Sequence, residues 1–161
     1  MATSIDMRPD TAAGRIVGNA VITSVSNGRV CVTTSAPTDL VIDLFGWFGA
    51  SGTRQLTAVG AERVLDTRTH AGRRVDPMKP LLVNAINEAD VVNLTAADPQ
   101  GSGFMVLHGC GALPAVSSVN VAADVDRPVL ALAAAGTDGE CITSSVATHV
   151  VIDRTARFSS R

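Results

Sequence analysis

The chain contains one of its own segments twice, and this internal repeat limits the fold more than any local pattern does. Residues 31–48 recur 110 positions later as residues 141–158, and eight of the eighteen aligned positions are identical. Most of the remaining pairs up to the shared aspartate are mild exchanges, such as Leu40 with Val150. A match at a fixed offset marks a repeated structural unit. We therefore expect more than one copy of the same module.

The match extends upstream, but the two copies differ in length. With one residue of slippage, the turn dipeptide Asn27-Gly28 aligns with Asp138-Gly139, and residues 3–6 resemble residues 117–120. Both dipeptides are of the kind that closes β-hairpins. Before that point the second copy has roughly sixty further residues, starting near Leu56, which the first copy lacks because the chain begins there.

This difference in length predicts the domain organisation. We expect residues 1–48 to be the C-terminal half of one module, residues 49–53 a linker, and residues 54–161 a complete second module. A half module leaves strand edges without neighbours, so it should self-associate, dock on its neighbour or complete it by strand exchange.

Short apolar runs bounded by Gly, Pro, Asn and Asp recur about every ten residues, which predicts an all-β fold. Only five residues are aromatic although 46% are hydrophobic, so the core should consist of Val, Leu, Ile and Ala. We expect an antiparallel β-sandwich, jelly-roll or immunoglobulin-like, plus half of a sister module. Expected strands of the complete module are 63–66, 81–86, 90–97, 103–108, 116–121, 129–134, 140–143 and 148–153. Those of the half module are 16–23, 29–34 and 39–45.

Composition and motif searches exclude several classes of function. The formal charge of −2 provides no electrostatic attraction to nucleic acid, and no apolar run approaches the ~20 residues that span a bilayer. The sequence has no Gly-x-Ser-x-Gly elbow, phosphate-binding loop, dinucleotide fingerprint or His-Glu-x-x-His pair. We therefore expect no enzymatic activity, no cofactor, no nucleic-acid partner and no membrane span.

An ordered set of short motifs runs through the complete module. These are Arg-Val-Leu-Asp-Thr-Arg at 63–68, Val-Val-Asn-Leu-Thr at 91–95, Gly-Phe followed by Cys-Gly within 103–111, and Pro-x-x-Ser-Ser-x-Asn at 114–120. The first copy ends in Val-Ile-Asp-Leu-Phe-Gly-Trp-Phe at 41–48, from which the complete module departs after Asp153. The set resembles a family of modules found in secreted and surface proteins of actinobacteria, which close with Val-Val-Asp-x-x-Gly-Tyr-Phe.

The resemblance implies an accessory role outside the cell. Modules of this family often sit beside peptidases, amidases or other hydrolases, and the family supplies no catalytic site. An extracellular or cell-wall location is therefore expected, although Met1 to Asp10 lacks the basic and apolar regions of a signal peptide. The expected partner is a cell-wall glycan or a surface protein.

The three cysteines suggest one disulfide. If Cys110 pairs with Cys141, the partner of Cys31 would have belonged to the missing half of the first module, which explains the odd number. The alternative is buried, reduced thiols. His108 and His149 would complete a two-Cys, two-His zinc set with Cys110 and Cys141, but no Cys-x-x-Cys pair anchors one. We expect no metal.

Asp66 and Arg68 form the most chemically loaded segment. A carboxylate followed by a hydroxyl can cap a bend, and the arginine can fork onto a carboxylate. Asp153 within the complete module, or Asp43 across the junction, is the expected partner of Arg68. The functional interpretation is a polar ligand site with Asp66 and Arg68 at its floor. The structural interpretation, which we favour, is an ion pair that fixes strand order.

Trp47 and Phe48 offer an aromatic platform for a sugar ring, with a plug at the end of the sandwich as the alternative. Together these features predict a non-catalytic extracellular or cell-wall-associated β module. It would bind a glycan or a protein partner, or space a neighbouring hydrolase. The alternative is a structural protein that forms homo-oligomers through the exposed strand edges of its half module.

Overall fold

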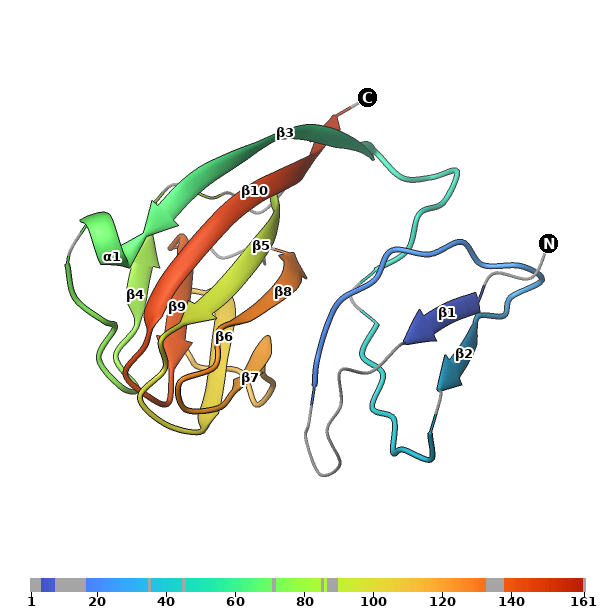
Figure 1. The fold of residues 1–161 in the computed structure, drawn as a ribbon. Coiled ribbons are helices and arrows are strands. Elements are labelled where there is room, and N and C mark those ends of the chain that lie inside the picture. The colour runs from blue at the N-terminus through green and yellow to red at the C-terminus, as the bar shows by residue number, and fades with distance from the viewer. Residues whose placement is uncertain are drawn as a thin grey trace. The chain divides into compact units, whose positions relative to one another are not determined.

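The computed structural model describes residues 4–7, 17–34, 36–44, 46–70, 72–84, 86, 90–132 and 138–160. The chain forms two compact units (Figure 1). One contains Met1–Ile16 and Val21–Gly52, and the other contains Val17–Ala20 and Thr53–Arg161. No helix within the described part of the chain is long and apolar enough to cross a bilayer.

The second unit is a sandwich of two four-stranded antiparallel sheets, which confirms the predicted all-β class. One sheet has the order β3-β10-β5-β8, made of Arg54–Asp66, His149–Ser160, Asp90–Ala97 and Arg127–Leu132. The other has the order β4-β9-β6-β7, made of Leu81–Val83, Glu140–Ser144, Gly103–Gly109 and Val119–Val121. A short helix, α1 (Thr67–His70), follows β3 at one end of the sandwich (Figure 1).

The core lies between the two sheets and follows the alternation of the strands. Every second residue of a strand contributes an aliphatic side chain, as Val92, Leu94 and Ala96 do from β5 and Val150 and Ile152 do from β10. The facing sheet adds Val83, Met105, Leu107, Val119, Val121 and Ile142. These buried residues are aliphatic, as the composition predicted.

Two strands extend far beyond the predicted ranges. β3 pairs with β10 from Val151 opposite Asp66 to Ser160 opposite Arg54, with register shifts between Ile152 and Asp153 and between Arg154 and Ala156. Residues 57–62 of β3 are exposed and carry no alternating apolar pattern. Their conformation is set by backbone pairing with β10, which a hydrophobic pattern cannot reveal.

The open edge of β8 is protected. Pro128 has no backbone N–H to offer, and the N–H of Leu130 donates to the Oδ1 of Asn19 at 3.0 Å. Asn19 lies in the short segment Val17–Ala20, which belongs to this second unit. A proline and a side-chain cap are both ways of preventing edge-to-edge pairing.

The first unit has little secondary structure among its described residues. β1 (Ser4–Met7) pairs in parallel with β2 (Cys31–Thr34), and Asn27-Gly28 forms a turn with both φ angles positive. That turn agrees with the hairpin signal in the sequence. The predicted strands at 16–23 and 39–45 are wrong for residues 17–23 and 39–44, while Ile16 and Phe45 lie outside the described residues. Their apolar character is that of strands, but no strand in the described part of the first unit pairs with them.

Candidate functional site

The two copies of the repeat lie in opposite environments. In β10, the side chains of Val150, Val151 and Ile152 are 0%, 4% and 0% exposed. Their counterparts Leu40, Val41 and Ile42 are 45%, 89% and 73% exposed. Nearly the same sequence is therefore the centre of the core in one unit and an uncovered apolar segment in the other. We call residues 40–44 and 46–48 the exposed segment.

The exposed segment ends in aromatic residues. Trp47, the only tryptophan of the chain, is 83% exposed, and Phe48 is 58% exposed. Leu44 adds a further aliphatic side chain at 79% exposure. These aromatics do not act as a buried plug. They remain candidates for stacking on a ligand, as the sequence suggested.

Asp66 is the centre of a charged cluster at the junction of β3 and α1. Its Oδ1 accepts hydrogen bonds from the backbone N–H of Arg68 at 3.0 Å and from the Nε of Arg68 at 2.9 Å. Its Oδ2 accepts from Arg68 at 2.7 Å and from Arg63 at 2.9 Å. The carboxylate is buried and caps the start of α1, while both guanidinium groups remain about half-exposed.

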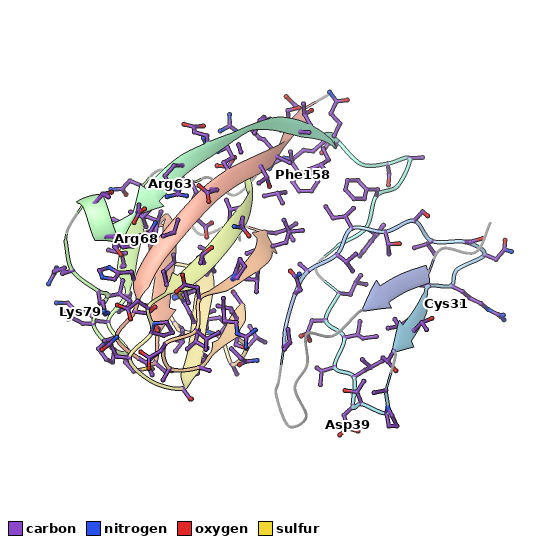
Figure 2. The ribbon with its side chains drawn as sticks, viewed as in Figure 1. Cys31, Asp39, Arg63, Arg68, Lys79 and Phe158 are labelled. Atoms are coloured by element: carbon purple, nitrogen blue, oxygen red, sulfur yellow. A yellow bond between two sulfur atoms is a disulfide. The ribbon has the colours of Figure 1, made fainter. Side chains whose placement is uncertain are left out.

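The cluster continues from β3 to β10 through Arg63, which forms an ion pair with Asp153 on the neighbouring strand. Figure 2 shows Arg63 and Arg68 at this end of the sandwich. The sequence assigned the pairing with Asp153 to Arg68, but Arg68 folds back onto Asp66 and Arg63 holds Asp153. The register explains the difference, because Arg63 lies directly opposite Asp153. Asp43, the other expected partner, is exposed in the first unit.

These contacts have clear electrostatic consequences. The pKa of the Asp66 carboxyl lies well below its usual value, chiefly because the Arg68 side chain donates hydrogen bonds to it. The same bonds raise the pKa of Arg68, and the hydrogen bond to Asp153 raises that of Arg63. The acceptor oxygens of Asp66 are thus occupied by the protein itself. The cluster is arranged to hold β3, α1 and β10 together.

We expect Asp66→Asn to lower the free energy of unfolding by about 2 kcal/mol at pH 7. Because folding depresses the pKa of Asp66, its stabilisation is present above the unfolded value of about 4 and is lost as the pH falls below it. The difference from wild type should therefore shrink between about pH 4 and pH 2. Urea unfolding at pH 7, 4 and 2.5 measures it.

The exposed Asp39 provides the control, because Asp39→Asn should change stability little at any of these pH values. An Asp66→Asn difference that stays constant across the whole pH range would contradict the role of the ionised carboxylate.

Thr67 ties the same motif to β10 by another route. Its Oγ1 accepts from the backbone N–H of Val150 at 2.9 Å and contacts the Nδ1 of His149 at 3.2 Å. Burial lowers the pKa of His149, and the nearby charges of Arg74 and Arg68 lower it further. The Asp-Thr-Arg motif thus acts as a structural clasp through all three of its side chains.

Sequence reasoning missed a second charged cluster, centred on Asp90 at the start of β5. Asp90 is 1% exposed, and its two oxygens accept from the Nε of Arg154 and the Nε of Arg157, both at 2.9 Å. Arg154 also donates to Glu62 at 2.7 Å. Residues 154 and 157 would lie on opposite faces of a regular strand, and the register shift between Arg154 and Ala156 turns both toward Asp90. The only signal in the sequence was a charged residue preceding a run of buried ones.

The predicted disulfide between Cys110 and Cys141 is confirmed, with a Cα–Cα distance of 4.9 Å. The disulfide uses both cysteine sulfurs that the alternative zinc site would need as ligands. His108 is also engaged, with its Nδ1 2.7 Å from the carbonyl oxygen of Gly109 and its Nε2 3.0 Å from the Thr143 hydroxyl. Among the described residues, no group of three His, Cys, Asp or Glu side chains could hold a metal ion. Cys31 is exposed and free.

Comparisons with protein-family models, with curated proteins and with solved structures find no match. We therefore interpret the site from the two copies within the chain itself. In the second unit, the charged clusters and the disulfide stabilise the sandwich. In the first unit, the apolar residues of the exposed segment and the Cys31 thiol are accessible to solvent.

Proposed function

We propose that this chain is a non-catalytic β module that binds a protein partner through its first unit, outside the cell or at the cell wall. The observation that carries the proposal is the exposure of Leu40, Val41 and Ile42, whose counterparts form the centre of the sandwich core. Residues of this kind gain free energy when another surface removes them from water. An exposed segment with the sequence of a core strand has this property built in.

The density of apolar side chains supports a binding role. Among the described residues of positions 41–48, five are large and apolar and more than half exposed, namely Val41, Ile42, Leu44, Trp47 and Phe48. Single exposed apolar residues are ordinary on a protein surface, but concentrated ones are typical of interaction sites. Aromatic residues are also enriched among the residues that dominate binding energy.

Two further features support the location and the absence of catalysis. The Cys110–Cys141 disulfide is typical of proteins that work in an oxidising compartment, in agreement with the resemblance to secreted and surface modules. The ionic side chains around Asp66 bind one another, as expected of a structural clasp. A module of this type would connect a neighbouring hydrolase to a surface protein.

A glycan is the second candidate ligand, favoured by the 83% exposure of Trp47. Tryptophan offers a large flat face on which a sugar ring can stack. The protein partner remains the first choice because the aliphatic residues Val41 and Ile42 have no role in stacking on sugars.

Co-sedimentation with insoluble actinobacterial cell walls tests the proposal, using walls before and after protease treatment. We expect saturable binding that falls at least tenfold in the double variant Val41→Ser, Ile42→Ser and that disappears from protease-treated walls. Asp39→Asn, beside the same segment, is the matched control and should bind normally. Binding that survives protease but is lost in Trp47→Ala would establish the glycan alternative instead.

Light scattering after size-exclusion chromatography tests self-assembly. A mass that rises with protein concentration, and falls in the Val41→Ser, Ile42→Ser variant, would establish the homo-oligomer. A monodisperse monomer that binds neither kind of wall would contradict the proposed function.

A further inference from the structure

The strand directions of the first unit suggest what is missing from it. In the second unit, β7 and β9 each pair antiparallel with β6, so they run parallel to one another with β6 between them. In the first unit, β1 and β2 also run parallel, but they pair directly. By sequence, β1 corresponds to the region of β7 and β2 corresponds to β9.

The first unit therefore has the directions of the second, with the middle strand absent. A two-stranded parallel sheet is unusual in an otherwise antiparallel protein, and removal of a β6-type strand accounts for it. The register differs from that arrangement by two residues. Met105 of β6 lies opposite both Val119 and Ser144, whereas Ile5 lies opposite Val32, two residues before the counterpart of Ser144. A shift of two keeps each residue on its own face of the sheet.

The free thiol lies where such a middle strand would be cross-linked. Cys110 follows directly after β6 and forms its disulfide with Cys141 of β9. Cys31 of β2 is the counterpart of Cys141 and is exposed and free. A strand of the β6 type, inserted beside β2, would carry its own cysteine to Cys31.

Residues 40–42 are paired with no strand among the described residues, and the same insertion would supply one. Its counterpart β10 pairs with β5, and β5 connects to β6 through the turn that contains Asp98 and Gly101. One continuous segment, whose two strands lie in opposite sheets of the sandwich, thus covers Val150–Ile152 and also carries β6 and Cys110. β3 and β4 also pair with β10 and β9, but β4 lies on the other side of β9 from β6 and carries no cysteine. Among the described strands, β5 and β6 therefore fit the missing neighbours best.

We infer that the partner of the first unit is a two-strand segment of the β5–β6 type, whose second strand is followed by Cys-Gly and enters between β1 and β2. The inference rests on the proposed function and names the chemistry of its partner. Strand insertion of this kind adds main-chain hydrogen bonds for affinity and side-chain pockets for specificity. An intact second copy is not this partner, because its own β5 and β6 are already part of its sandwich and its Cys110 is already bonded to Cys141.

The covalent step is thiol–disulfide exchange. The Cys31 thiol loses its proton, and the thiolate attacks the partner's cysteine, held in a disulfide with a small thiol such as glutathione. The S–S bond between Cys31 and the partner's cysteine forms. The S–S bond between the partner's cysteine and glutathione breaks, and the released glutathione thiolate takes up a proton. No separate oxidant is needed.

The test uses the full-length oxidised chain and a synthetic peptide of residues 90–111, with its Cys110 capped by glutathione. Mass spectrometry should show one peptide on Cys31, formed at least tenfold faster than with a peptide of scrambled order that keeps the capped Cys-Gly end. Emission of Trp47 should shift to shorter wavelength, and should do so even with a Cys110→Ser peptide. Cys31→Ser should abolish the adduct but keep the shift.

Equal rates for the two peptides, with no change in Trp47 emission, would overturn the inference. Disulfide dimers of the full chain through Cys31, formed with no preference for the peptide, would overturn it in favour of a second copy. Wall binding measured in parallel separates this result from failure of the proposed function. If the chain still binds walls but the peptide does not react preferentially, only the identity of the inserted segment is wrong.

Discussion

Ile152→Ala is expected to lower the free energy of unfolding by about 3 kcal/mol, whereas Ile42→Ala is expected to change it by less than about 0.5 kcal/mol. The two isoleucines occupy equivalent positions of the repeat, but Ile152 is 0% exposed and Ile42 is 73% exposed. Truncating Ile152 removes buried methyl groups and leaves a cavity between the sheets. Truncating Ile42 removes atoms that are already in water.

Far-UV circular dichroism during urea unfolding measures both variants. Trp47 fluorescence would be the wrong probe here, because the only tryptophan lies outside the sandwich. Equal destabilisation by the two substitutions would mean that the exposed segment is covered in solution, and would contradict the account.

Loss of the Cys110–Cys141 disulfide is expected to have an effect of similar size. The bridge spans 31 residues, and closing a loop of that length stabilises the folded state by about 3–4 kcal/mol in the chain-entropy model. The double variant Cys110→Ala, Cys141→Ala should therefore lose about that amount, measured by the same urea titration.

Cys31→Ala is the matched control. Since Cys31 is exposed and free, its replacement should leave the unfolding midpoint unchanged, and so should addition of a reductant to the Cys110→Ala, Cys141→Ala variant. A destabilisation by Cys31→Ala comparable to that of the double variant would show that Cys31 has a structural role in the folded chain.

Much of the sandwich could be predicted from the sequence, because its strands carry alternating apolar residues. The range predicted for β5 agrees with the structure, since Val92, Leu94 and Ala96 alternate with residues of the opposite face between clear turn residues. The Cys110–Cys141 disulfide could be predicted because the repeat places Cys31 and Cys141 at equivalent positions, which leaves Cys110 as the partner of Cys141 within the complete module.

Features that depend on the register between paired strands could not be predicted from the sequence. The extension of β3 over exposed residues required knowledge of its register with β10. The ion pair of Arg63 with Asp153, and the pairing of Asp90 with Arg154 and Arg157, also follow from register and from a bulge. A buried carboxylate needs a positively charged partner, but the pairing register of the strands determines which arginine lies opposite it.

The first unit illustrates the opposite case. Residues 39–44 have the sequence of a central strand and yet form no strand, because strand formation requires a partner across which backbone hydrogen bonds can form. The pattern correctly identified a segment suited to a sheet. It could not show that the adjacent strands are lacking.

Hydrogen exchange followed by mass spectrometry tests this account most directly, since it compares the two copies in one molecule. We predict that amides of residues 151–154, paired with β3 on one side and β5 on the other, exchange at least about a hundredfold more slowly than those of residues 39–44. Equal protection of the two segments in the isolated chain would contradict it, because the first copy would then already be part of a complete sheet.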